Sequence, residues 1–222
     1  MKKLFHIAID GPAGSGKSTV AKEISKRLGI LYDDSGALYR MIAYYFQGNG
    51  VDLADVLYIQ SHLDEISIVY ADGHYILNGE IISSQIRKPQ SGASASAVSR
   101  IGQVREKVNF VIRGISEKCS MVVDGRDIGT VVLKDARYKF FLTASSQERA
   151  ERRYKELIEK NENVSFEDVL NEINQRDRAD SSRSIAPLKP APDAVIIDTT
   201  GMAVEQVCDI IAGYIDSGDI RG

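Results

Sequence analysis

The chain has 222 residues, of which 43% are hydrophobic and 27% are charged, and its net charge is −3. This length and balance are typical of a globular protein with a full core, and they exclude a disordered chain. The acidic balance disfavours a nucleic-acid coat, which needs a basic surface. No apolar run approaches the ~20 residues of a membrane span, so we expect a cytoplasmic protein that binds neither nucleic acid nor membranes.

In the first quarter of the chain, short apolar runs alternate with helical patterns. Residues 4–9 form a run typical of a buried parallel strand, too short for a secretory signal, and residues 30–32 are a second candidate. Apolar side chains at helical spacing predict helices over 17–28, where Gly29 is a stop signal, and over about 38–46. The order strand, helix, strand, helix indicates a crossover unit.

The pattern changes after residue 64. Three short strand-like runs follow, at 66–70, 74–77 and 80–83. The pairs Asp72-Gly73 and Asn78-Gly79 separate them and are typical of hairpin turns. They predict a small antiparallel insertion within residues 64–100. Residues 91–99 are small and polar, which indicates a hinge-like link or the start of a helix.

Strands and helices alternate again in the second half. Helical spacing is found at 104–115, 146–158, 165–178 and 204–214, and strand-like runs at 121–123, 139–142 and 194–197. Ser145 with Glu148, and Ser165 with Asp168, match helix N-cap signals. This alternation favours an α/β fold with a parallel sheet and right-handed crossovers. The two cysteines, Cys119 and Cys208, lie in apolar stretches without a C-x-x-C pair, so we expect buried free thiols.

A phosphate-binding loop is the strongest signal in the chain. The pattern G-x-x-x-x-G-K-[ST] is complete between a predicted strand and a predicted helix, and its residues are Gly11, Pro12, Ala13, Gly14, Ser15, Gly16, Lys17 and Ser18. Glycines let backbone N–H groups surround phosphate oxygens, and the helix N-terminus adds its positive end. Lys17 is expected to reach the β- and γ-phosphates of ATP, and the Ser18 hydroxyl to bind Mg²⁺.

The loop alone leaves the reaction open, because GTPases, ATP-driven machines and small kinases share it. The sequence has no NKxD-type guanine reader, and its length favours a small-molecule kinase. Three further segments are rich in arginine and aspartate, at residues 34–40, 124–129 and 176–183. The first two follow predicted strands, where ligands of open α/β sheets bind.

Arginines in these segments suit a second phosphorylated substrate. Guanidinium groups stay charged when buried and bind phosphate through paired hydrogen bonds. Phosphoryl transfer depends on positioning and charge neutralisation, and an ionised phosphate acceptor needs no general base. The histidines fit that interpretation, because none of His6, His62 and His74 lies directly beside these motifs.

Taken together, the loop, Asp34 to Arg40, Asp124 to Val132 and the late run from Arg176 to Leu188 resemble bacterial cytidylate kinases. The resemblance implies transfer of the ATP γ-phosphoryl group to CMP or dCMP. It also implies a five-stranded P-loop core with an inserted monophosphate-binding region, matched by 64–100, and a mobile lid over about 150–183. We expect one kinase domain over 1–222, and a monomer.

The same resemblance implies the site residues one by one. The acceptor phosphate would lie near Ser35, Arg40, Arg126 and Arg183, the cytosine near Asp127, Ser96 and Arg105, and the pentose near Arg176 and Asp180. On the ATP side, Thr19 extends the loop, and Arg152 and Arg153 correspond to lid arginines. Lys17, Arg126, Arg152 and Arg183 are the expected catalytic residues. A carboxylate such as Asp127 suits cytosine, because it accepts from the exocyclic amine and repels the carbonyl of uracil.

Two other functions stay open on the sequence alone. One is a kinase for another acceptor, such as UMP, AMP or a metabolite hydroxyl, for which Asp34 is the only plausible general base. The other is a nucleotide-dependent switch without a small acceptor. Turnover with a free nucleotide acceptor separates the switch from the kinases.

Overall fold

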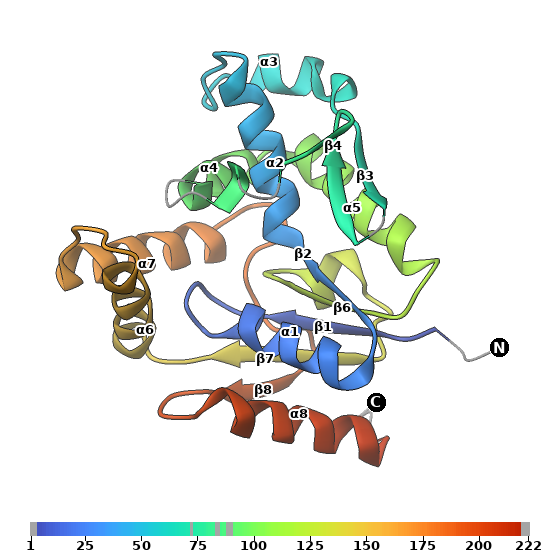
Figure 1. The fold of residues 1–222 in the computed structure, drawn as a ribbon, viewed down its shortest axis with the longest axis vertical. Helices are drawn as coiled ribbons and strands as arrows, with labels where there is room; N and C mark the ends of the chain where they lie inside the picture. The colour runs from blue at the N-terminus through green and yellow to red at the C-terminus, as the bar shows by residue number, and fades with distance from the viewer. Residues whose placement is uncertain (1–3, 72, 83–84, 88–90, 219–222) are drawn as a thin grey trace. The chain divides into compact units, whose positions relative to one another are not determined.

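The computed structural model describes residues 4–71, 73–82, 85–87 and 91–218 (Figure 1). The chain divides into two compact units. The first consists of Met1–Asp33 with Cys119–Gly222, and the second of Asp34–Lys118. None of the helices in these described residues is long and apolar enough to cross a membrane.

A five-stranded sheet forms the centre of the first unit, in the order β2-β6-β1-β7-β8. Its strands are β1 (His6–Asp10), β2 (Leu31–Asp34), β6 (Met121–Gly125), β7 (Tyr138–Thr143) and β8 (Val195–Asp198). β1 runs parallel to both neighbours, with Ile7 opposite Val122 on one side and Tyr138 on the other. The predicted α/β fold with a parallel sheet is confirmed. β1 begins two residues later than predicted and includes Asp10.

Among the described residues of this unit, four segments form α-helices and one segment forms a π-helix. They are α1 (Lys17–Leu28), η3 (Ile128–Val132, the π-helix), α6 (Ser146–Glu159), α7 (Phe166–Ser181) and α8 (Val204–Ser217). Gly29 ends α1 in the left-handed conformation, as its position predicts. The Ser145 hydroxyl accepts from the Glu148 N–H and the Ser165 hydroxyl from the Asp168 N–H, so both predicted N-caps are confirmed. The Glu148 side chain bonds Arg152 instead of closing a capping box.

The main core of the first unit lies between the sheet and the helices α1 and α8, which lie next to each other (Figure 1). Ile7, Ile9 and Phe140 project from the strands, and Ile24 and Ile211 meet them from the two helices. Burying each such side chain contributes roughly 1.5–3 kcal/mol. Because these helices stabilise the strands from one face, they fix the loop that joins β1 to α1. Cys208 is buried here as expected, whereas Cys119 is only half-buried.

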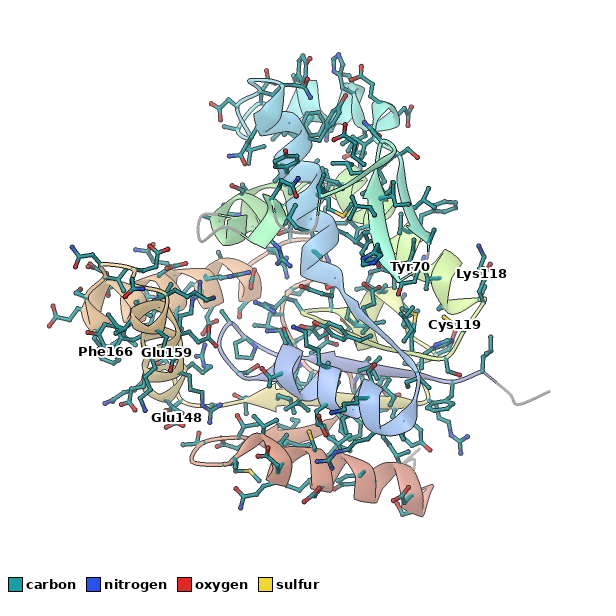
Figure 2. The ribbon with its side chains drawn as sticks, in the orientation of Figure 1. Tyr70, Lys118, Cys119, Glu148, Glu159 and Phe166 are labelled. Atoms are coloured by element: carbon teal, nitrogen blue, oxygen red, sulfur yellow. The ribbon has the colours of Figure 1, made fainter. Side chains whose placement is uncertain are left out.

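Helices α6 and α7 form a hairpin with a small core of its own. Leu157, Val169 and Ile173 are buried between the two helices, and the rings of Tyr154 and Phe166 meet edge to face at 6.0 Å. Figure 2 labels Glu148 where the chain enters α6, and Phe166 at the start of α7. The hairpin thus has a stable interior that can carry polar side chains in fixed positions.

The second unit combines helices with a three-stranded antiparallel sheet, β3-β4-β5. Its elements are α2 (Ser35–Gly48), α3 (Val56–Ser61), η1 (Leu63–Glu65), β3 (Ile68–Ala71), β4 (His74–Leu77), β5 (Glu80–Ile81), η2 (Gln85–Arg87), α4 (Ser91–Val98) and α5 (Gly102–Ser116). Both predicted hairpins are present, and Asn78 and Gly79 take the positive φ values of 47° and 89° that a tight turn requires. Asp72 and Ser83, which belong to these predictions, lie outside the described residues.

Residues 91–98 form helix α4, so of the two alternatives predicted for this segment the helix is confirmed and the hinge-like link is wrong. Alanine and serine alternate along it, so the hydrophobic periodicity that identifies a helix is weak, while alanine itself favours the helical state. Contacts with α2 hold α4 in place. Helix α3 was also not predicted, because only Ile59 among its residues is buried.

Candidate active site

The phosphate-binding loop joins β1 to α1, as predicted, and its shape depends on glycine. Gly14 and Gly16 have φ values of 74° and 82°, which disfavour any side chain. A Cβ atom at Gly11 would overlap the carbonyl oxygen of Leu142 on the neighbouring strand β7. Helix α1 starts directly after Gly16, so its first N–H groups have no partner within the helix and are available to an anion.

Two side chains complete this loop. Lys17 is buried, and its Nζ donates to the Pro12 carbonyl at 3.0 Å, which folds the side chain back over the loop. The Ser15 hydroxyl is 1% exposed, and its Oγ has no hydrogen-bond partner among the described residues. A buried hydroxyl without a partner costs free energy, and a phosphate oxygen in the loop would supply one. The loop is therefore built for a polyphosphate.

A pair of oxygen ligands lies beside the loop. The Ser18 hydroxyl donates to Asp124 Oδ2 at 2.7 Å, and the Tyr32 hydroxyl donates to Asp124 Oδ1 at 2.7 Å. A hydroxyl next to a carboxylate is a donor set that suits Mg²⁺. The sequence indicated Ser18 for the metal and left its further ligands open, and the structure adds Asp124 as a candidate. The available signal was its position at the end of β6, the strand next to β1.

Of the two predicted ATP arginines on α6, Arg152 lies near the loop. Its guanidinium donates to the Thr199 carbonyl at 2.7 Å and to Glu148 at 3.0 Å, and the Thr199 hydroxyl donates to the Ser15 carbonyl at 3.4 Å. Thr199, which follows β8, thus connects Arg152 to the loop, and sequence reasoning did not include it. Arg153 instead pairs with Glu156 on the outer side of the helix, at 3.1 Å.

Three predicted substrate residues come together around Asp180, near the end of α7. Arg126 Nε donates to Asp180 Oδ2 at 2.9 Å, and Arg183 donates to the Asp180 carbonyl at 3.2 Å. Burial opposes the charge on Asp180, but the nearby guanidinium groups of Arg126, Arg183 and Arg176 outweigh it and lower the pKa of this carboxyl. The cluster therefore brings three guanidinium groups near one buried carboxylate, and guanidinium groups are well suited to binding an anion.

Asp127, the predicted cytosine reader, is buried at the start of π-helix η3. The chain is fixed there by Asp10, whose two carboxylate oxygens accept from the Ile128 and Gly129 N–H groups, each at 2.8 Å. Burial raises the pKa of Asp10 to about 7, despite these two hydrogen bonds. Asp10 also directly precedes the phosphate loop. One side chain thus connects the loop to the segment that carries Arg126 and Asp127.

In the second unit, Asp34 organises the start of α2. Its Oδ1 accepts from the Ala37 N–H at 3.2 Å, and its Oδ2 pairs with Arg40 at 2.6 Å. A Cβ atom at Gly36 would lie 3.0 Å from both the Arg40 guanidinium and Asp34 Oδ1, so glycine makes room for this pair. Ser35 is buried beside it. Both oxygens of Asp34 are engaged, which weakens its candidacy as a general base.

The other predicted substrate residues of this unit also meet. Arg105 is 3% exposed, and its Nη1 donates to the Ser99 carbonyl at 3.0 Å. The Ser99 hydroxyl in turn donates to the Ser96 carbonyl at 2.9 Å. The Arg105 guanidinium also lies over the ring of Tyr39, 5.6 Å from its centre. Ser99 and Tyr39 were not singled out from the sequence, because their roles depend on how α2, α4 and α5 pack.

The parallel sheet, the glycine loop after β1, and the hydroxyl and carboxylate beside it define a P-loop nucleotide-binding protein. A family model described as cytidylate kinase matches residues 7–217, and the chain belongs to that family. Cytidylate kinase from Pseudothermotoga lettingae is 50% identical over 207 residues, which cover 93% of this chain and 92% of that protein. The cytidylate kinase from Thermosipho melanesiensis is 49% identical over 205 residues, or 92% and 94% of the two chains.

A solved structure shows the same fold. An uncharacterized protein from Eubacterium ventriosum superposes with a TM-score of 0.56 and 17% identity, over 96% of this chain and 99% of its own. At that identity the likeness concerns the fold alone.

Proposed function

We propose that this protein is a phosphotransferase that moves the γ-phosphoryl group of ATP to CMP and dCMP, giving ADP and the nucleoside diphosphate. The observation that carries the proposal is the cluster of Arg126, Arg183 and Asp180, in a chain of the cytidylate kinase family with an intact phosphate loop. A loop for one polyphosphate and a separate cluster for another anion match a reaction between two phosphorylated molecules.

ATP is proposed to bind with its β- and γ-phosphates in the loop of residues 11–18. The Gly14 and Gly16 conformations, the α1 N-terminus and the Ser15 hydroxyl without a partner support this. Lys17 would move from the Pro12 carbonyl to phosphate oxygens, where its charge is needed. Arg152, connected to the loop through Thr199, would neutralise charge that develops on the transferred group, with Arg153 nearby on α6.

Ser18 and Asp124 are proposed to hold Mg²⁺, which would neutralise charge on the phosphates of ATP. The 2.7 Å contact between the Ser18 hydroxyl and Asp124 Oδ2 supports this assignment, because it places a hydroxyl next to a carboxylate oxygen. Tyr32 orients the same carboxylate through its other oxygen.

The acceptor phosphate is proposed to take Arg126 and Arg183 as its main partners. Asp180 balances these arginines in the absence of nucleotide, and phosphate oxygens can share them because each guanidinium has several donors. Arg40 and Ser35, from the second unit, are proposed to reach the same phosphate when CMP is bound. An ionised phosphate oxygen is already a nucleophile, so the reaction requires no general base.

The cytosine is proposed to be read by Asp127 with Ser96 and Arg105, and the pentose by Arg176 and Asp180. Asp127 accepts from the exocyclic amine of cytosine, whereas the carbonyl of uracil would face it with repulsion. Losing a hydrogen bond to a charged group costs about 1.5–3 kcal/mol, which corresponds to at least about tenfold discrimination. The buried positions of Asp127 and Arg105 support the proposal, since contacts strengthen away from water.

We also propose that residues 150–183 act as a lid and residues 64–100 as a monophosphate-binding insertion. Closure of such segments excludes water during transfer. Hydrogen exchange in residues 91–99 and 159–165 should slow when CMP and a non-hydrolysable ATP analogue are added together. Exchange that is the same with and without the two ligands would contradict the lid proposal.

The experiment that tests the function is ADP formation from Mg·ATP with CMP, dCMP, UMP or AMP, or without acceptor. Fast turnover with CMP and dCMP and slow turnover with UMP is the expected result. If UMP were phosphorylated as fast as CMP, the protein would still be a nucleotide kinase, but the proposed role of Asp127 in reading cytosine would be wrong. Slow ATP hydrolysis at a rate that no acceptor changes would favour the nucleotide-dependent switch.

We also propose that the protein works as a monomer in the cytoplasm. Light scattering of the pure protein tests whether it is a monomer.

A further inference from the structure

Arg149 is a buried arginine that joins three parts of the first unit. Its guanidinium Nε donates to the Ala144 carbonyl at 2.9 Å, in the connection from β7 to α6. Its Nη1 donates to the Ala13 carbonyl of the phosphate loop at 2.9 Å. The same Nη1 pairs with Asp177 Oδ2 on α7 at 2.6 Å. One side chain therefore contacts the phosphate loop, the connection that leads into α6, and the C-terminal half of α7.

The phosphate loop and α6 are also in direct contact at this point. A Cβ atom at Gly14 would lie 3.1 Å from both the Cβ and the carbonyl oxygen of Arg149, closer than such atoms normally approach. The loop therefore rests on the first turn of α6 without room for a side chain. A displacement of Arg149 would therefore shift the backbone of the loop at Gly14, because the two are in direct contact.

The third partner connects this contact to the acceptor cluster. Asp177 lies on α7 one residue after Arg176 and three residues before Asp180, and Asp180 pairs with Arg126. The contacts therefore run from Ala13 through Arg149 to Asp177, and helix α7 connects Asp177 to Asp180. We infer that Arg149 and Asp177 are positioning residues that hold α7 in register with the phosphate loop, so that binding of ATP and binding of the acceptor are energetically coupled.

The chemistry of the pair suits this task. The Arg149 and Asp177 side chains are only 6% and 21% exposed, so neither charge is well solvated without the other. The Ala13 and Ala144 carbonyls occupy two more of the Arg149 donors, which fixes the direction of the planar guanidinium. A lysine would keep the charge but has no fork with which to contact all three partners.

This inference rests on the proposed function, since the coupling concerns ATP and CMP. The decisive variant is Asp177→Asn, which keeps the size of the side chain and removes its charge. Glu172→Gln is the matched control, because Glu172 is an exposed carboxylate on the same helix. Arg149→Lys and Asp177→Glu are measured as well, so that the contact can still be tested if Asp177→Asn does not fold. Thermal unfolding establishes that each variant is folded.

The affinity for CMP is measured by calorimetry with and without a saturating non-hydrolysable ATP analogue, beside kcat and both KM values. In the wild type the analogue should change CMP affinity at least about fivefold. In Asp177→Asn this factor should approach one and kcat should fall about tenfold, while KM for ATP changes less than about twofold. Asp177→Glu should recover part of both losses, and Glu172→Gln should match the wild type.

Two results would overturn the inference. One is a wild-type CMP affinity that is independent of the analogue. The other is a folded Asp177→Asn variant with the coupling and kcat of Glu172→Gln. Failure of the proposed function is recognised separately, because the wild type itself would then make no diphosphate from CMP.

Discussion

Two regions of the first unit are suited to phosphate, and they are built by different means. The phosphate loop presents backbone N–H groups, and its shape depends on glycines at positive φ. The cluster of Arg126, Asp180 and Arg183 presents side chains from segments 54 residues apart, held around one carboxylate. The backbone loop is formed before a ligand arrives, whereas the arginines keep a partner that a ligand must share. We therefore expect substitutions in the loop to affect every acceptor and substitutions in the cluster to affect the acceptor alone.

The largest expected effect is at Lys17, the one charged side chain of the loop. Lys17→Ala should lower kcat about 10³-fold or more, because charge on the transferred phosphoryl group is left without its cation. The fold should persist, since Lys17 does not belong to the apolar core between the sheet and the helices α1 and α8. Steady-state rates with CMP, beside circular dichroism, measure this. Lys26→Ala, at an exposed position of the same helix, is the control; a folded Lys17→Ala with normal turnover would contradict the loop assignment.

The arginine cluster should show a smaller and more selective loss. Arg126→Ala should lower kcat/KM for CMP about 10²-fold and leave the affinity for an ATP analogue within about twofold, because the loop is untouched. Arg137→Ala is the matched control, since this exposed arginine lies over the Tyr138 ring outside the cluster. Equal losses for both nucleotides would show that the two regions are not separate binding sites.

Within the acceptor region, Asp127 should decide which base is used. Asp127→Ala should reduce the preference for CMP over UMP by at least about tenfold, because the acceptor for the cytosine amine is removed. The ratio of kcat/KM for the two nucleotides measures it, with Asp135→Ala, at an exposed position beyond η3, as the control. An unchanged ratio in Asp127→Ala would assign base recognition to other residues.

The last effect is on folding stability and not on turnover, and it concerns Asp10, which connects the two regions. Its pKa is raised from 3.8 to about 7 by burial, so its contribution to stability is complete below pH 3.8 and is lost as the pH rises to 7. The unfolding free energy of the wild type should fall relative to Asp10→Asn over this window, by up to about 1.4 kcal/mol per pH unit. Urea unfolding of both proteins at several pH values measures the difference. A difference independent of pH would mean that Asp10 titrates normally.

Much of the fold could be predicted because its signals are local. The phosphate loop, helix α1 with its Gly29 end, and the Asn78-Gly79 turn each depend on residues adjacent in the sequence. Helix α4 was ambiguous because its small residues carry little periodicity. The π-helix η3 was not predicted at all, since it depends on Asp10, more than a hundred residues earlier.

The site divides in the same way. Lys17 and Ser18 follow from the loop motif, and the arginines follow from their clustering after strands and from the family resemblance. Asp124 and Arg149 acquire their roles only from contacts between distant segments. Ser18 meets Asp124 across 106 residues, and Arg149 meets Ala13 across 136. Such contacts could not be predicted from a local sequence pattern, because they arise from the order of the strands in the sheet and from helix packing.

The most direct test of the central claim follows the phosphoryl group itself. The protein is incubated with ATP labelled in the γ-phosphate, together with CMP, and the products are separated. We predict that the label appears in the β-phosphate of CDP, with little in inorganic phosphate, and that Lys17→Ala abolishes both signals. Label found only in inorganic phosphate, at a rate independent of CMP, would contradict a kinase acting on a phosphate acceptor.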